Sequence, residues 1–165
     1  RVRAAVEARE AGADILIMAR TDARAGHGLD EALWRLQAFA DLGADILFLE
    51  APQDEAEMRT FCQALPGPKM ANMLEEGVTP LLPPAVLAAM GYKIAAYPLT
   101  LLSSAVFAMR EVLADLKAGR VPLRRVDFAT LREIVGFGDY HRLLEHYEGE
   151  SPSRSAQAGQ RRGKG

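Results

Sequence analysis

Apolar residues recur along the chain in two alternating patterns. Residues 1–11 and 29–40 place apolar side chains three and four positions apart, which is the spacing of an amphipathic helix. Each of these segments is followed by a short run that is apolar at every position, residues 15–19 and 46–49. A strand that is apolar on both faces is typical of a parallel sheet buried under helices.

The same phrase, Gly-Ala-Asp-Ile-Leu, closes both helices and opens both strands. It begins at Gly12 and again at Gly43. Glycine readily adopts the positive φ that ends a helix, so the phrase predicts a helix end followed by a strand at both places. An internal repeat of this kind indicates that the chain is built from successive helix–strand units.

Two weaker copies of the unit follow. A helix predicted over residues 54–65 leads into a strand at 69–73, and a short helix at 84–90 leads into a strand at 93–97. Helix, glycine and strand thus occur in this order four times. The repetition predicts an α/β fold in which right-handed crossovers connect parallel strands.

The remaining sequence predicts helices and then a tail. A long helix is expected over residues 99–118, with one buried face made of Leu101, Leu102, Ala105, Met109, Val112, Leu113 and Leu116. Residues 128–147 are expected to form two helical pieces hinged at Gly136 and Gly138. Residues 149–165 have no apolar periodicity, which predicts a disordered tail after a folded domain at residues 1–148.

Composition excludes several classes of function. Lys and Arg number 20 against 22 Asp and Glu, so the net charge of −2 provides no broad positive field for nucleic acid. The longest apolar stretch, residues 94–109, is interrupted by Pro98 and is shorter than the roughly 20 residues of a membrane span. The single cysteine, Cys62, fits a reducing compartment, so we expect a cytoplasmic protein that binds neither membrane nor nucleic acid.

Polar side chains occupy the carboxyl ends of the four predicted strands, where parallel α/β proteins gather their functional groups. They are Arg20, Glu50, Asn72 and Tyr97. A guanidinium group binds carboxylates through a planar fork, an amide both donates and accepts, and a carboxylate accepts from a hydroxyl group or a metal-bound water. The set therefore suits a small substrate that carries several carboxylates.

Each of these residues also has a purely structural interpretation. Instead of binding a substrate, Arg20 could form an ion pair with Asp22 or Glu50 at the rim of the sheet. Asn72 is of the type that forms turns, and Tyr97 is of the type that packs at a core or rim.

Five phrases at these strand ends carry a specific resemblance. They are ARTDA at residues 19–23, LDEA at 29–32, GAD with FLEAP at 43–52, ANM with Glu75 and GVTP at 71–80, and GYK with Tyr97 and Pro98 at 91–98. Over residues 1–148 the sequence resembles the isocitrate lyase and phosphoenolpyruvate mutase superfamily, and most of all its methylisocitrate and dimethylmalate lyases.

The resemblance implies a TIM-like (β/α) barrel of the phosphoenolpyruvate/pyruvate type, of which this chain would be the C-terminal half, about four strands with the C-terminal helices. It implies a magnesium-dependent carbon–carbon lyase that cleaves a 2-hydroxy di- or tricarboxylate through an enolate. The Asp-x-Asp pair that holds Mg²⁺ and the loop with the proton-donating cysteine are expected upstream of Arg1. The fragment alone is therefore expected to be inactive, and the helix at 99–118 is expected to be exchanged between subunits in a homo-oligomer of the full-length parent.

The resemblance also assigns roles to individual residues. Arg20 would bind a substrate carboxylate and the developing negative charge, Glu50 would orient the substrate or metal-bound waters, and Asn72 would hold a second carboxylate. Thr79, Pro80 and Tyr97 would line the substrate site. No residue of this chain is expected to bind the metal directly.

Other functions stay open at this point. A phosphonomutase or an oxaloacetate decarboxylase belongs to the same superfamily. A half-barrel without activity could instead associate with itself through its unpaired strand edges. An aldolase would need a Schiff-base lysine at a strand end, whereas Lys69 and Lys93 lie where strands begin.

Overall fold

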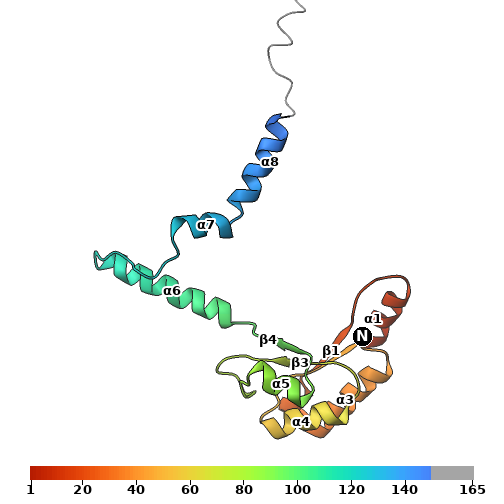
Figure 1. The fold of residues 1–165 in the computed structure, drawn as a ribbon. Coiled ribbons are helices and arrows are strands. Elements are labelled where there is room, and N and C mark those ends of the chain that lie inside the picture. The colour runs from red at the N-terminus through yellow and green to blue at the C-terminus, as the bar shows by residue number, and fades with distance from the viewer. Residues whose placement is uncertain (150–165) are drawn as a thin grey trace, which may run out of the picture. The chain divides into compact units, whose positions relative to one another are not determined.

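The computed structural model describes residues 1–149, which fall into two units, 1–109 and 110 onward (Figure 1). The first unit contains α1 (Val2–Glu10), β1 (Met18–Thr21), α2 (Ala23–His27), α3 (Leu29–Asp41), β2 (Ile46–Leu49), α4 (Glu55–Ala64), β3 (Lys69–Asn72), α5 (Pro84–Met90) and β4 (Ile94–Ala96). Helix α6 (Thr100–Lys117) begins in this unit and ends in the second, which also contains α7 (Phe128–Ile134) and α8 (Phe137–Gly149).

The four strands form one parallel sheet in chain order, β1-β2-β3-β4. Each strand therefore pairs with the strand that precedes it in the chain, which is the arrangement found in a (β/α) barrel. The predicted α/β class, the four helix–strand units and the parallel pairing are confirmed. Gly12 and Gly43 have φ values of +121° and +92°, as the repeated phrase predicts.

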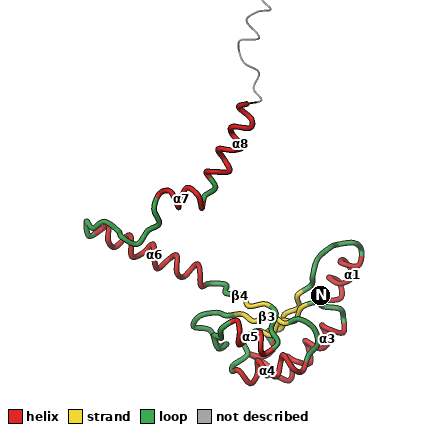
Figure 2. The backbone as a smooth tube through the Cα atoms, viewed as in Figure 1, coloured by secondary structure: helices red, strands yellow, loops and turns green. Residues whose placement is uncertain are grey.

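Helices α3, α4 and α5 lie together on one side of the sheet (Figure 2). Their largest buried side chains are Leu36, Met58, Phe61 and Leu87. They pack in one cluster with Leu47, Leu49 and Ala71 of the strands and with Met73, which directly follows β3. Because side chains alternate along a strand, these residues identify the helix-covered face, and the residues between them lie on the other face.

The first strand begins later than the sequence pattern predicts. Ile15 and Leu16 are 57% and 73% exposed, and β1 starts at Met18. The ladder between the first two strands opens where the backbone N–H groups of Asp45 and Ile46 both donate to the carbonyl oxygen of Ile17. The residues before Ile17 lie beyond this first bridge, so their apolar character does not make them part of the strand.

Helix α6 has the predicted length but not the predicted buried face. None of its residues is buried, and Leu101 and Leu113 are 84% and 64% exposed. The expectation of a buried face is wrong for the chain as the structure shows it, because no other described element covers the helix. Among the described residues, no helix combines the length and the apolar character needed to cross a bilayer.

The end of the chain agrees in part with expectation. Gly136 has a φ of +79° and separates α7 from α8, which confirms the predicted hinge, whereas Gly138 lies inside α8. The predicted tail at 149–165 lies outside the described residues apart from Gly149, the last residue of α8. The domain boundary after residue 148 therefore stays a prediction.

Asp45, from the second copy of the repeated phrase, ties the beginnings of two strands together. Its carboxylate accepts a hydrogen bond from the backbone N–H of Ile17 at 2.8 Å. It also forms an ion pair with Arg9. Both contacts favour the ionised form, the hydrogen bond from Ile17 most of all, and they lower the pKa of Asp45.

We expect Asp45 to make the stability of the chain depend on pH. A carboxyl group whose pKa is lower in the folded state stabilises the fold above its unfolded pKa, near 4, and this contribution is lost as the pH falls through the folded pKa. The Asp45→Asn variant should therefore unfold at lower urea concentration at pH 6, and the difference from wild type should shrink toward pH 3. Asp14→Asn, at the equivalent and exposed position of the first copy, is the control. Parallel stability–pH curves for wild type and Asp45→Asn would contradict this role.

Candidate active site at the carboxyl ends of the strands

The register of the sheet places three predicted site residues on one face. Arg20 pairs in register with Phe48, and Phe48 with Met70. Glu50 and Asn72 each lie two residues further along, so alternation directs Arg20, Glu50 and Asn72 to the face opposite α3, α4 and α5. The carboxyl ends of β1, β2 and β3 thus present a cation, an acid and an amide side by side.

Arg20 contacts both of the acids that could partner it. Its Nε donates to Asp22 Oδ1 at 2.8 Å, and its Nη1 lies 3.3 Å from Glu50 Oε2. The guanidinium also lies over the ring of Phe48, 5.1 Å from its centroid. The structural interpretation of Arg20 as a rim ion pair is therefore realised in this structure. The side chain is still 47% exposed, so part of the guanidinium remains accessible to a ligand.

Glu50 extends the ladder of β2 and has an unusual carboxylate. Its backbone N–H donates to the carbonyl oxygen of Thr21 at 3.1 Å, which fixes the residue beside the end of β1. Oε2 is buried and accepts no hydrogen bond, because its contact with Arg20 is an ion pair without hydrogen-bond geometry. A buried carboxylate oxygen without a donor is costly, and a ligand hydroxyl group or an ordered water would satisfy it.

Asn72 is the last residue of β3, in register with Ala96 of β4. Its side chain is half-buried and forms no hydrogen bond with another described residue. The turn after this strand is made instead between Leu74 and Gly77, whose N–H donates to the Leu74 carbonyl oxygen at 3.1 Å. The turn-forming interpretation of Asn72 is thus not realised, and its amide is available.

The other predicted substrate residues are Thr79, Pro80 and Tyr97. Thr79 and Pro80 are half-buried in the segment between β3 and α5, and Tyr97, directly after β4, is 42% exposed. Within the described part of the chain, no hydrogen bond, ion pair or ring contact joins them to Arg20, Glu50 or Asn72. Their assignment to the substrate site stays a prediction.

One contact at this end of the sheet was not predicted. Thr100, the first residue of α6, donates its hydroxyl hydrogen to Glu75 Oε1, and this hydrogen bond lowers the pKa of Glu75. The second oxygen, Oε2, is buried without a hydrogen-bond partner. Glu76 follows with a φ of +60°, a backbone conformation that residues other than glycine rarely adopt. The contact joins the segment after Asn72 to the start of α6.

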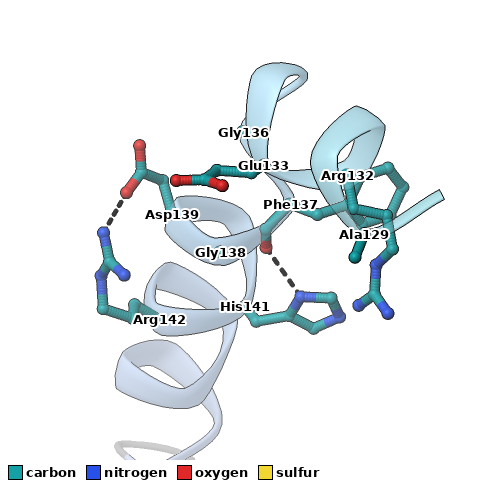
Figure 3. A pocket seen from close by; sticks show the side chains of 9 residues that line it. All are labelled: Ala129, Arg132, Glu133, Gly136, Phe137, Gly138, Asp139, His141 and Arg142. Atoms are coloured by element: carbon teal, nitrogen blue, oxygen red, sulfur yellow. Dashed lines mark hydrogen bonds and ion pairs between the residues drawn. The ribbon is translucent and has the colours of Figure 1, made fainter. Parts of the chain in front are cut away.

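Two hollows lie among the described residues near polar groups. One, of about 430 Å³, lies beside Arg20 and is lined also by His27, Arg35 and Phe39, whereas Glu50 and Asn72 are not part of its lining. The other, of about 500 Å³, lies between α7 and α8 in the second unit (Figure 3).

Several of the polar groups that line the hollow between α7 and α8 contact one another. Arg142 pairs with Asp139, and His141 Nδ1 lies 2.7 Å from the Phe137 carbonyl oxygen (Figure 3). Arg132 lies over the ring of Phe137, 5.6 Å from its centroid. With these groups engaged with one another, the ionisable lining offers a ligand little beyond the Glu133 carboxylate.

The described residues provide no metal site of their own. No group of three or more His, Cys, Asp or Glu side chains lies close enough together in residues 1–149 to hold an ion. The acids that contact Arg20 at this site are Asp22 and Glu50, two carboxylates rather than three. The donor set of the described chain does not fit direct coordination of a metal.

Comparison with known proteins relates the chain to a family of enzymes. Residues 1–117 match the family described as phosphoenolpyruvate phosphomutase. The 2,3-dimethylmalate lyase of Eubacterium barkeri is 39% identical over 151 residues, 89% of this chain and 52% of the relative. The 2-methylisocitrate lyase of Bacillus subtilis (strain 168) is 36% identical over 139 residues, 82% of this chain and 46% of the relative.

A solved structure confirms the architecture. The crystal structure of 2,3-dimethylmalate lyase, a member of the PEP mutase/isocitrate lyase superfamily, superposes with a TM-score of 0.79 at 36% identity. The match covers 88% of this chain and 53% of that one. The chain therefore spans about half the length of the relatives it matches, and its four strands correspond to half of a TIM-like barrel.

We expect the contact between Thr100 and Glu75 to hold the segment that follows Asn72. Thr100→Val keeps the shape of the side chain and removes the donor, so backbone amides at residues 74–79 should exchange with deuterium several-fold faster, because a lost hydrogen bond to a charged acceptor favours opening. Thr100→Ser keeps the hydroxyl group and should exchange like wild type. Equal exchange in the Val and Ser variants would show that the hydroxyl does not hold the segment.

Proposed function

The chain belongs to the phosphoenolpyruvate mutase/isocitrate lyase family, and we propose that it supplies the C-terminal half of a barrel enzyme that cleaves a carbon–carbon bond of a 2-hydroxy di- or tricarboxylate. The observation that carries the proposal is the placement of Arg20 and Glu50 at adjacent strand ends, 3.3 Å apart, on the face that they share with Asn72. The named activities of the two curated relatives, both lyases, support it.

Each residue has a role that follows from its chemistry. Arg20 binds one substrate carboxylate through the exposed part of its guanidinium, and Asn72 binds a second carboxylate through its amide. The buried Oε2 of Glu50, which lacks a donor in this structure, accepts a hydrogen bond from the substrate hydroxyl group or from a bound water.

The reaction begins when the substrate hydroxyl group gives its proton to a general base. The electrons of that O–H bond form a carbonyl group, the adjacent carbon–carbon bond breaks, and its electron pair passes into an enolate that is then protonated. Negative charge develops on oxygen as the bond breaks, and the positive charge of Arg20 stabilises it more than it stabilises the bound substrate.

Magnesium is part of the proposal, with its ligands and the proton donor contributed from outside this chain. When bound, Mg²⁺ would polarise the oxygen atoms of the substrate. The residues described here do not form such a site by themselves, and they act on the substrate and its water. A reducing, cytoplasmic compartment fits the single cysteine, Cys62.

A phosphonomutase is the second candidate function. The description of the matching family as phosphoenolpyruvate phosphomutase favours it. Leu74 bears on the choice, since its apolar side chain stands two residues after Asn72 and offers no hydroxyl group to a carboxylate. A chimera that interconverts phosphoenolpyruvate and phosphonopyruvate but leaves 2,3-dimethylmalate intact would favour this candidate.

We expect Arg20 to be required for turnover in an assembled barrel. A chimera would join the part of the Eubacterium barkeri 2,3-dimethylmalate lyase that this chain does not match to Arg1 of this chain, and it should cleave 2,3-dimethylmalate. Arg20→Ala should lower kcat/KM by about 100-fold or more, as loss of one charge-stabilising donor does elsewhere. Cleavage is followed by the appearance of the carbonyl product.

Two controls accompany this experiment. Arg59→Ala removes an exposed arginine of α4 that pairs with Glu55 at 3.4 Å and should leave the rate unchanged. The 165-residue chain alone, supplied with Mg²⁺, should show negligible turnover. Unchanged kinetics in Arg20→Ala would remove this residue from the proposed site, and turnover by the chain alone would contradict the half-barrel interpretation.

We further propose that α6 joins two copies of the chain by helix exchange. A stripe of exposed apolar residues runs along it at the spacing of a helix seam, namely Leu102, Val106, Met109, Leu113 and Leu116. A continuous apolar stripe of this length is rarely left in water by a stable protein.

A charged pair of substitutions in the stripe should break this association. Met109→Glu with Leu113→Glu should lower the mass measured by light scattering from that of a dimer or larger assembly to that of a monomer, because two carboxylates would be buried without partners. Ser104→Glu, on the same helix outside the stripe, is the control. An unchanged mass in the doubly substituted chain would show that α6 does not form the interface.

A further inference from the structure

An ion pair joins the segments that follow β1 and β2, away from the residues of the proposed site. Arg24 of α2 and Glu57 of α4 meet in a two-point contact, with Nε to Oε2 at 2.8 Å and Nη2 to Oε1 at 2.5 Å. The side chains are 16% and 15% exposed, which makes this pair less exposed than the other ion pairs described in residues 1–149. A fork-to-fork contact fixes orientation as well as distance.

Glu57 also contacts the loop that carries Glu50, although it lies in α4 itself. Its Oε2 accepts the backbone N–H of Gln53 at 2.9 Å, and its own N–H donates to Asp54 Oδ1 at 2.8 Å. The loop between β2 and α4 is thus held at both ends, by Glu50 N–H on the Thr21 carbonyl oxygen and by Gln53 N–H on Glu57.

The backbone between these two anchors is in a disfavoured conformation. Ala51 has a φ of +54°, in the left-handed region, where a Cβ lies too close to the following carbonyl oxygen. A loop that contains such a residue keeps its shape only where the surroundings hold it. The contacts of Glu57 supply that restraint, and Arg24 holds Glu57 in turn.

We propose that Arg24 and Glu57 are positioning residues that set the place of the Glu50 carboxylate relative to Arg20. Arg24 lies four residues after Arg20, in the first turn of the helix that follows β1. Glu57 lies seven residues after Glu50, in the first turn of the helix that follows β2. Locking one helix to the other therefore fixes the two strand ends whose side chains meet at 3.3 Å.

The electrostatics of the pair suit this role. The hydrogen bonds from Arg24 lower the pKa of Glu57, and Glu57 raises the pKa of Arg24. Both groups consequently stay charged at neutral pH. The catalytic part of the inference rests on the proposed function, whereas the restraint on the loop can be measured in this chain without any activity.

The first experiment measures amide hydrogen exchange in the 165-residue chain. In the Arg24→Met variant, Glu57 loses the contact that holds it. The amide of Gln53 should therefore exchange several-fold faster and that of Glu50 measurably faster, both relative to the amides of β3. Arg59→Met is the matched control, since it removes an arginine of α4 whose pair with Glu55 is half exposed. If Arg24→Met lowers stability throughout, Arg24→Lys keeps the charge but loses the fork, and should release the same amides without global change. Wild-type exchange at Gln53 and Glu50 in both variants overturns the proposal.

The second experiment uses the chimera with the dimethylmalate lyase. Arg24→Met and Glu57→Gln should each lower kcat by about 10- to 100-fold with little change in KM, which is the range expected when a catalytic group is displaced by about 1 Å. Arg24→Lys should recover part of the loss. A loss of activity that parallels the loss of folded protein, with kcat per folded molecule unchanged, counts against the inference.

The two experiments separate the two claims. A wild-type chimera without activity contradicts the proposed function, and the exchange rates at Gln53 and Glu50 then decide the inference alone. An active chimera whose Arg24 and Glu57 variants have wild-type kcat contradicts the inference and leaves the proposed function standing.

Discussion

The hydrogen-bonded register between β1 and β2 is the constraint on which the rest of the site depends. It sets Arg20 beside Phe48 and extends one step further, through the N–H of Glu50 and the carbonyl oxygen of Thr21. A shift of this register by one residue would turn Glu50 toward α3 and α4 and bring a core leucine to the open face. The ion contact between Arg20 and Glu50 is therefore a consequence of strand pairing, and the buried cluster on the opposite face enforces it.

Much of this arrangement follows from local sequence. The phrase that begins at Gly12 and Gly43 fixes where helices end, and fully apolar runs mark buried parallel strands. Once the strands are parallel, their carboxyl ends share one edge, so the sequence alone places Arg20, Glu50 and Asn72 there. The start of β1 could not be placed, because Ile15 and Leu16 have strand-like composition but lie before the first bridge to β2.

The contacts that hold the site depend on tertiary structure. Arg24 and Glu57 are 33 residues apart, and Glu75 and Thr100 are 25 apart. The sequence pattern predicts no element between β1 and α3, where the short helix α2 places Arg24. Asp54 followed by Glu57 is a recognisable helix-start pattern, but the pattern gives no information about which cation will meet Glu57. The same limit applies to helix α6. Its periodicity predicts an apolar face but gives no information about what covers that face.

The exposure of the site to water weakens the charge interactions on which the proposed activity depends. Two unit charges 4 Å apart interact by about 1 kcal/mol in water and about 4 kcal/mol at the effective dielectric constant of a protein surface. Arg20 is half exposed, and on its face of the sheet Met18 and Ile94 are 41% and 38% exposed. Covering that face with further strands of a barrel would exclude water from Arg20 and Glu50 together. The same closure would bury the apolar residues and strengthen the field that Arg20 exerts on developing negative charge. Closing the barrel would thus both stabilise the fold and favour the reaction.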